Sequence, residues 1–123
     1  MKSSLHPTLI LECRKKLLQL KQDLLNRAKA SEKNLILEDR SGDEIDQAVA
    51  LLQENTFLIG QERMRTQLLE IEMALAKIAD GSYGICEETE EMIEIDRLRA
   101  LPWTRLSIEG AEIREAMNRK FAR

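Results

Sequence analysis

Apolar side chains recur every three or four residues along two long stretches of the chain, residues 7–38 and 45–78. This spacing gathers them on one side of an α-helix, so each stretch predicts a long amphipathic helix. The pattern breaks at residues 37–42, where Gly42 permits a tight turn. Because a short turn brings the second helix back beside the first, both apolar stripes can be buried only in an antiparallel coiled-coil hairpin.

The composition favours helices over a compact α/β enzyme. Aromatic residues make up 3% of the 123 residues and charged residues 33%, and the apolar share consists mainly of Leu, Ile, Ala and Met, which favour helices. A chain of this length forms about one domain with a modest core. The sequence contains no phosphate-binding loop, HExxH motif or nucleophile elbow, so we expect no enzymatic activity.

The seam of the hairpin can be assigned from the spacing. In the first helix it comprises Ile10, Leu17 and Leu24, flanked by Leu11, Leu18 and Leu25. In the second helix it comprises Ile45, Val49, Leu52, Thr56 and Ile59, and then Met64, Leu68, Ile71, Leu75 and Ile78. The step from Ile59 to Met64 is five residues, so we expect the seam to shift there. Pro7 suits the first turn of the first helix, and Ser41 with Glu44 forms a capping box before the second.

A different module follows the turn residues at 80–84. Short apolar segments come first, and residues 107–123 have the spacing of a terminal helix. We therefore expect a mainly all-α protein. The hairpin occupies residues 1–80, with its tip at about 39–46, and residues 81–123 form a small globular module that resembles a degenerate zinc finger with a C-terminal helix.

Charge and targeting signals narrow the function. The net charge is −3, which gives no general attraction for a phosphate backbone, so direct DNA binding is not expected. The sequence shows neither a signal peptide nor a membrane-spanning stretch, which predicts a cytoplasmic protein without membrane contact. In that compartment Cys13 and Cys86 should stay reduced, with Cys13 in the core of the first helix.

Two carboxylates, Asp43 and Asp46, lie three residues apart at the start of the second helix. This spacing puts them on one face at the tip of the hairpin. Their residue types fit simple stabilisation of a helix N-terminus. They also fit a rod that delivers negative charge into a site containing metal ions or basic groups. The acidic run at residues 87–91 is most simply a solvated face.

Two pairs of residues have the spacing of zinc ligands, but three of the four residues cannot bind zinc as Cys or His would. Cys86 is followed three residues later by Thr89, and Ser107 by Gly110. A structural zinc site needs four Cys or His ligands, and only Cys86 qualifies, so we expect no zinc and no other cofactor. Cys86 is then either a small buried residue or an exposed thiol sensitive to oxidation.

The motifs Gly42-Asp43-Glu44-Ile45-Asp46, Tyr83-Gly84-Ile85-Cys86-Glu87 and Arg97-Leu98-Arg99-Ala100-Leu101-Pro102 occur in the order found in a known family. The chain resembles the DksA/TraR regulators from the tip to about Ile113. The resemblance implies a bacterial transcription regulator, connected with the stringent response, whose hairpin enters the secondary channel of RNA polymerase. It modulates initiation, for example at ribosomal RNA promoters, while the C-terminal module grips the β′ rim.

The same resemblance assigns roles to residues. Asp43, Asp46 and Ala48 would lie near the polymerase active centre, and Arg63 would contact the channel. The four zinc cysteines of the family fall at Cys86, Thr89, Ser107 and Gly110, which implies a zinc-free member held by packing that includes Ile93 and Trp103. The positions that carry basic residues for ppGpp in the polymerase complex read Glu70, Leu101 and Ala111, and these cannot attract a polyphosphate.

Other functions remain open on the sequence. A transcript-cleavage factor of the Gre type would use the same channel. A helical-hairpin chaperone or adaptor would depend on the apolar seam rather than on the tip acids. A carboxylate-based metal hydrolase would bind divalent metal by itself. A hairpin that closes on itself is expected to be a monomer.

Overall fold

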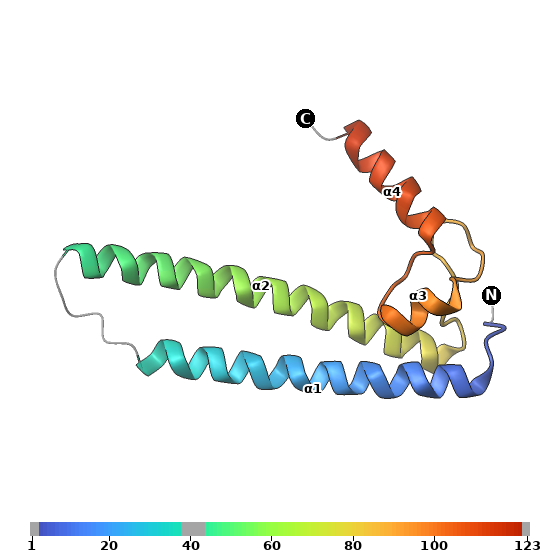
Figure 1. Ribbon diagram of the computed structural model, residues 1–123, viewed down its shortest axis with the longest axis horizontal. Helices are drawn as coiled ribbons and strands as arrows, with labels where there is room; N and C mark the ends of the chain where they lie inside the picture. Colours follow the sequence, from blue (N-terminus) through green and yellow to red (C-terminus); the bar gives the residue numbers. More distant parts are fainter. Residues whose placement is uncertain (1–2, 38–43, 122–123) are drawn as a thin grey trace. The chain divides into compact units, whose positions relative to one another are not determined.

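The computed structural model describes residues 3–37 and 44–121. Its helices are α1 (Pro7–Leu37), α2 (Glu44–Asp80), α3 (Ile95–Ala100) and α4 (Ile108–Phe121) (Figure 1). Over these residues the only strand-like pairing is an isolated bridge between Ile85 and Met92. The expected all-α class is confirmed. None of the described helices combines the length and the apolar character needed to cross a bilayer.

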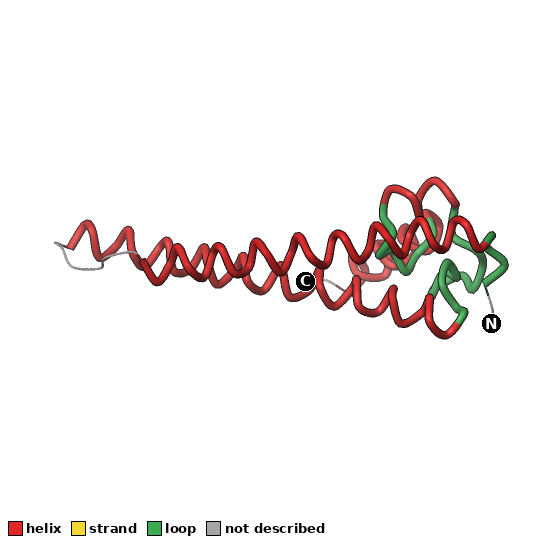
Figure 2. Tube along the Cα trace, turned by 90° about the horizontal axis from the view of Figure 1, so that it is seen from below, coloured by secondary structure: helices red, strands yellow, loops and turns green. Residues whose placement is uncertain are grey.

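The chain divides into two compact units. The base unit comprises residues 1–19 and 70–123, and the hairpin unit comprises residues 20–69. Within each unit a segment of α1 lies beside a segment of α2 that runs in the opposite direction (Figure 1, Figure 2). The division cuts both long helices instead of falling at residue 80, because the start of α1 and the end of α2 share a core with the C-terminal module. The predicted turn and capping residue Ser41 lie outside the described residues.

The core of the base unit draws on all of its segments. Its buried apolar side chains are Leu9, Cys13 and Leu17 of α1, Ile71 and Ala74 of α2, and Tyr83, Cys86, Ile93 and Leu98 of the module. The Tyr83 hydroxyl donates a 2.8 Å hydrogen bond to the Pro102 carbonyl, so the polar end of this buried side chain has a partner. Burial raises the pKa of Tyr83. The predicted core position of Cys13 is confirmed, and Ile93 is buried while Trp103 is half-buried.

The end of α2 shows why the module begins where it does. Gly81 has a φ of +85°, a left-handed conformation that glycine adopts without steric cost. The Ser82 amide then donates a 3.0 Å hydrogen bond to the Lys77 carbonyl, which closes the last turn as in a Schellman motif. The Asp80 carboxylate accepts hydrogen bonds from the Ser82 amide and hydroxyl. The chain therefore leaves the helix in a fixed direction toward Tyr83.

The predicted seam of α2 is wrong in its first half. Ile45, Val49, Leu52 and Ile59 are exposed by 73%, 46%, 66% and 62%. Partly buried side chains in this part of α2 are instead found at Ala50, Glu54, Phe57, Gln61, Met64 and Leu68. These continue in steps of four and three into Ile71, Leu75 and Ile78, so the expected shift at Ile59 is absent. The exposed apolar side chains suggested the wrong register, because the observed seam includes the small residue Ala50 and the polar residues Glu54 and Gln61.

Candidate functional site

The four degenerate zinc positions come together in the base unit around the sulfur of Cys86. The side chain of Cys86 is completely buried. The Ser107 hydroxyl donates to Cys86 Sγ at 3.4 Å, and the Thr89 amide donates to the same sulfur at 3.5 Å. Ser107 Oγ in turn accepts the Gly110 amide at 3.0 Å. Residues from two separate loops and from α4 thus form one hydrogen-bonded cluster.

The electrostatics of this cluster favour a thiolate. Burial raises the pKa of the Cys86 thiol, but hydrogen bonds from the Ser107 side chain and from Thr89 lower it by more, to about 6. The cluster also lies at the start of α4, where the helix macrodipole places partial positive charge. The sulfur therefore acts as an acceptor that holds the surrounding loops.

The residues of this cluster do not fit a zinc ion. A structural zinc needs four Cys or His ligands in a tetrahedron, whereas this set has one thiol, two hydroxyls and a glycine without a side chain. The space is closed as well, since a Cβ built on Gly110 would overlap Cys86 Sγ. Among the described residues, no group of three His, Cys, Asp or Glu side chains is arranged to hold a metal ion.

The loop that carries Cys86 is a tight knuckle. The Cys86 amide donates to the Glu91 carbonyl at 2.8 Å, and the Glu90 amide donates to the Cys86 carbonyl at 2.9 Å. Glu90 occupies the left-handed region with a φ of +61°, an uncommon conformation for a residue with a Cβ. The loop is therefore closed by its own backbone hydrogen bonds.

Glu87 is the centre of an ion-pair cluster beside this knuckle. Its carboxylate lies 2.8 Å from Lys77 Nζ, 3.6 Å from an Arg105 nitrogen and 3.4 Å from an Arg114 nitrogen. Burial raises the pKa of Glu87, but the Lys77 hydrogen bond and the positive charges of Lys77, Arg105 and Arg114 lower it below its usual value. Arg114 Nε also donates to Glu88 at 3.0 Å. The cluster links α2, the knuckle and α4.

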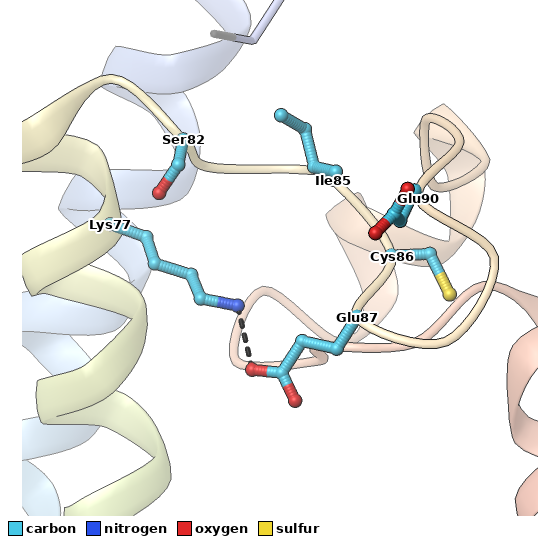
Figure 3. A pocket seen from close by; sticks show the side chains of 6 residues that line it. All are labelled: Lys77, Ser82, Ile85, Cys86, Glu87 and Glu90. Atoms are coloured by element: carbon cyan, nitrogen blue, oxygen red, sulfur yellow. Dashed lines mark hydrogen bonds and ion pairs between the residues drawn. The ribbon is translucent and has the colours of Figure 1, made fainter. Parts of the chain in front are cut away.

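The prediction of a solvated face agrees with the exposure of Glu87, but it missed the ion pairs that Glu87 and Glu88 form. Sequence alone shows five neighbouring positions with four carboxylates, but their basic partners lie 10 to 27 residues away along the chain. The side of the knuckle that carries Glu87 lines an open groove of about 470 Å³ together with Lys77, Ser82, Ile85, Cys86 and Glu90 (Figure 3). The dashed contact in that view is the ion pair between Lys77 and Glu87.

The predicted tip and channel residues belong to the hairpin unit. Asp46 lies in the first turn of α2 with Glu44, and both are exposed, as is Ala48. Asp43 lies outside the described residues. Arg63 is exposed on the same helix, 17 residues after Asp46. The structure therefore does not bring Arg63 into one site with the tip residues, and their roles remain predictions.

A helical hairpin combined with a small knuckle module defines a structural class, and comparison with known proteins identifies its family. The model of the prokaryotic dksA/traR C4-type zinc finger matches residues 81–116. The RNA polymerase-binding transcription factor DksA of Caulobacter vibrioides is 34% identical over 114 residues, covering 86% of this chain and 75% of the relative. This chain belongs to the DksA/TraR family.

Solved structures agree with this assignment. Transcription factor DksA2 from Pseudomonas aeruginosa is 34% identical with a TM-score of 0.82, over 92% of this chain and 88% of that one. The RNA polymerase binding protein and transcriptional regulator Dks from Chlamydia trachomatis is 23% identical, with a TM-score of 0.57 over 92% of this chain and 94% of its own. The second likeness supports the fold alone.

Proposed function

We propose that this protein regulates transcription by binding RNA polymerase through its secondary channel, where it modulates initiation without needing zinc. The observation that carries the proposal is the 34% identity to DksA2 over 92% of the chain, which includes the hairpin as well as the module. The similarity to the DksA of Caulobacter vibrioides over 86% of the chain supports it. The exposed acidic first turn of α2, with Glu44 and Asp46, supports a role for charge at this end of the hairpin unit.

Zinc independence is supported by the Cys86 cluster. Hydrogen bonds from Ser107 and Thr89 converge on the sulfur, and the ion pairs of Glu87 join the knuckle to α2 and α4. These contacts connect the same segments that four metal-bound cysteines would hold together. A regulator built in this way would keep its fold when zinc is scarce.

A role for ppGpp through the family positions is not favoured. Glu70 lies in α2, Leu101 follows α3, and Ala111 lies in α4. An acidic and two apolar side chains offer no charged donors to a polyphosphate. We therefore expect inhibition by this protein to be independent of added ppGpp at these contacts.

The deciding experiment is single-round transcription from a ribosomal RNA promoter by purified bacterial RNA polymerase in the presence of a chelator. Wild-type protein should inhibit, and the double variant Asp43→Asn, Asp46→Asn should bind polymerase without inhibiting. Glu44→Gln is the matched control, because it removes a carboxylate from the same turn without touching the carried-over pair. Wild-type protein that neither binds nor inhibits would refute the proposal, and stimulated cleavage of backtracked RNA would favour a Gre-type activity.

A further inference from the structure

Gly60 lies in the interior of α2 at a position where packing does not require a glycine. A Cβ built on Gly60 would meet no atom within 4 Å, so there is room for a side chain. Among all residues only proline weakens a helix interior more than glycine does. Gly60 therefore weakens α2 at this point, and close packing is not the reason for its presence.

Two threonines, one on each side of Gly60, act on the same stretch of helix. Thr56 Oγ1 donates to the Leu52 carbonyl at 2.9 Å, and Thr66 Oγ1 donates to the Glu62 carbonyl at 3.1 Å. A hydroxyl that bonds to the carbonyl four residues back shares the acceptor of a backbone amide, which slightly destabilises a helix and often bends it. Three weakening features thus fall on one short stretch of α2.

The packing of this stretch within the hairpin unit leaves room for movement. Among the described residues of α2, buried side chains begin only at Ile71, and the seam positions Phe57 and Gln61 beside Gly60 are half-buried. A hollow of about 180 Å³ adjoins the turn after Gly60 and is lined by Leu24, Leu25, Gln61, Met64, Arg65 and Leu68. Because protein interiors are normally close-packed, a hollow of this size lets the side chains around it shift without compression.

We propose that α2 has a hinge at Gly60, about which residues 44–59 bend while the helix on both sides stays intact. The neighbouring α1 contains no glycine and follows by smooth curvature, which permits a bend of about 15° over about twelve residues. Glu44, in the acidic first turn, lies about 24 Å from Gly60 at 1.5 Å per residue, so this bend moves the turn by about 6 Å. The hinge is a property of the free protein. Its use in aiming the acidic turn inside polymerase rests on the proposed function.

Hydrogen exchange of backbone amides in the free protein tests for local opening at the hinge. Amides 61–64 should exchange faster than those in the turns on both sides, because their carbonyl acceptors lie at residues 57–60. Gly60→Ala should slow these amides about fivefold by raising helix propensity. Gln67→Ala is the matched control, since it places alanine at another position of the same helix, and it should leave them unchanged. Exchange that rises steadily toward the tip, or equal slowing along all of α2 in Gly60→Ala, would overturn the proposal.

Residual dipolar couplings test whether the two parts of α2 in the hairpin unit move separately. In wild type, a hinge averages the orientation of residues 46–59 as one body, so their couplings should fit a weaker alignment than those of residues 61–69. The two alignments should become more alike in Gly60→Ala. A single alignment that fits both segments of wild type would contradict the hinge. Both measurements use the free protein, so their outcome does not depend on whether the proposed binding to polymerase is correct.

Discussion

The sulfur of Cys86 is the centre of the hydrogen-bonded cluster at the four degenerate zinc positions. In a zinc finger, four thiolates are neutralised by the ion. In this protein one sulfur accepts hydrogen bonds from the Ser107 hydroxyl and the Thr89 amide. The proposal of zinc independence therefore requires that this sulfur keeps its donors. Ser107 and Thr89 are therefore structural partners of Cys86 and not remnants without a role.

The low pKa of Cys86 predicts a pH-dependent stability. The folded pKa is about 6, below the unfolded value of about 8.5. The Cys86 thiolate therefore contributes fully to the free energy of unfolding above the unfolded pKa. This contribution declines as the pH falls from about 9 and is lost below about 6. In urea unfolding, the free energy of unfolding of wild type should rise by up to about 1.4 kcal/mol for each pH unit between about pH 6 and about pH 9. Cys86→Ala should lack this slope and Cys13→Ala should keep it; equal slopes in wild type and Cys86→Ala would contradict the assignment.

Two glycines should respond to alanine in opposite directions. A Cβ on Gly60 of α2 meets no atom within 4 Å, so Gly60→Ala should stabilise the protein by about 1 kcal/mol through helix propensity. A Cβ on Gly110 would overlap Cys86 Sγ, so Gly110→Ala should destabilise it by roughly 1–3 kcal/mol. Thermal unfolding followed by circular dichroism measures both. Stabilisation by Gly110→Ala would mean that the sulfur cluster is loosely packed.

The carboxylate of Glu87 joins three elements of the base unit, which are α2, the knuckle and α4. Glu87→Gln should lower the free energy of unfolding by about 1 kcal/mol, since the ion pairs are partly screened by solvent. Because the folded pKa of Glu87 is lowered, its contribution is present above the usual Glu pKa and is lost as the pH falls through the folded value. Wild type and Glu87→Gln should therefore become equally stable in acid. Glu91→Gln, on the same loop, is the control and should have little effect.

The sequence predicted the helices well and their contacts less well. Periodicity identified α1, α2 and α4, because three- and four-residue spacing is a property of the chain itself. It failed for the seam of α2, where Ala50, Glu54 and Gln61 lie toward α1 and larger apolar residues are exposed. Which face of α2 is buried depends on residues that are distant along the chain, and a local pattern does not report them. The partners of Glu87 were missed for the same reason.

At the scale of the whole molecule, the candidate site divides into a part that sequence could reveal and a part that it could not. The spacing of Cys86, Thr89, Ser107 and Gly110 indicated a degenerate zinc module, and the structure brings all four together. Their hydrogen bonds to one sulfur required the fold. The tip residues Asp43 and Asp46 rest on resemblance, so transcription assays must decide their role.

Placing cysteines at the three zinc positions that lack them gives the most direct test of the proposed zinc independence. Wild-type protein should unfold at the same temperature with and without a chelator, because its four zinc positions offer one thiol, two hydroxyls and a glycine. The variant Thr89→Cys, Ser107→Cys, Gly110→Cys should gain stability from added zinc, by about 4 kcal/mol when zinc exceeds its dissociation constant a thousandfold. The variant Thr89→Ser, Gly110→Ser, which keeps the native Ser107, places a hydroxyl where the other variant has each new thiol, and it should not respond. Loss of helicity of the wild type in chelator would instead show that this chain depends on a metal ion, and the hydrogen bonds to Cys86 would then be insufficient to hold the module.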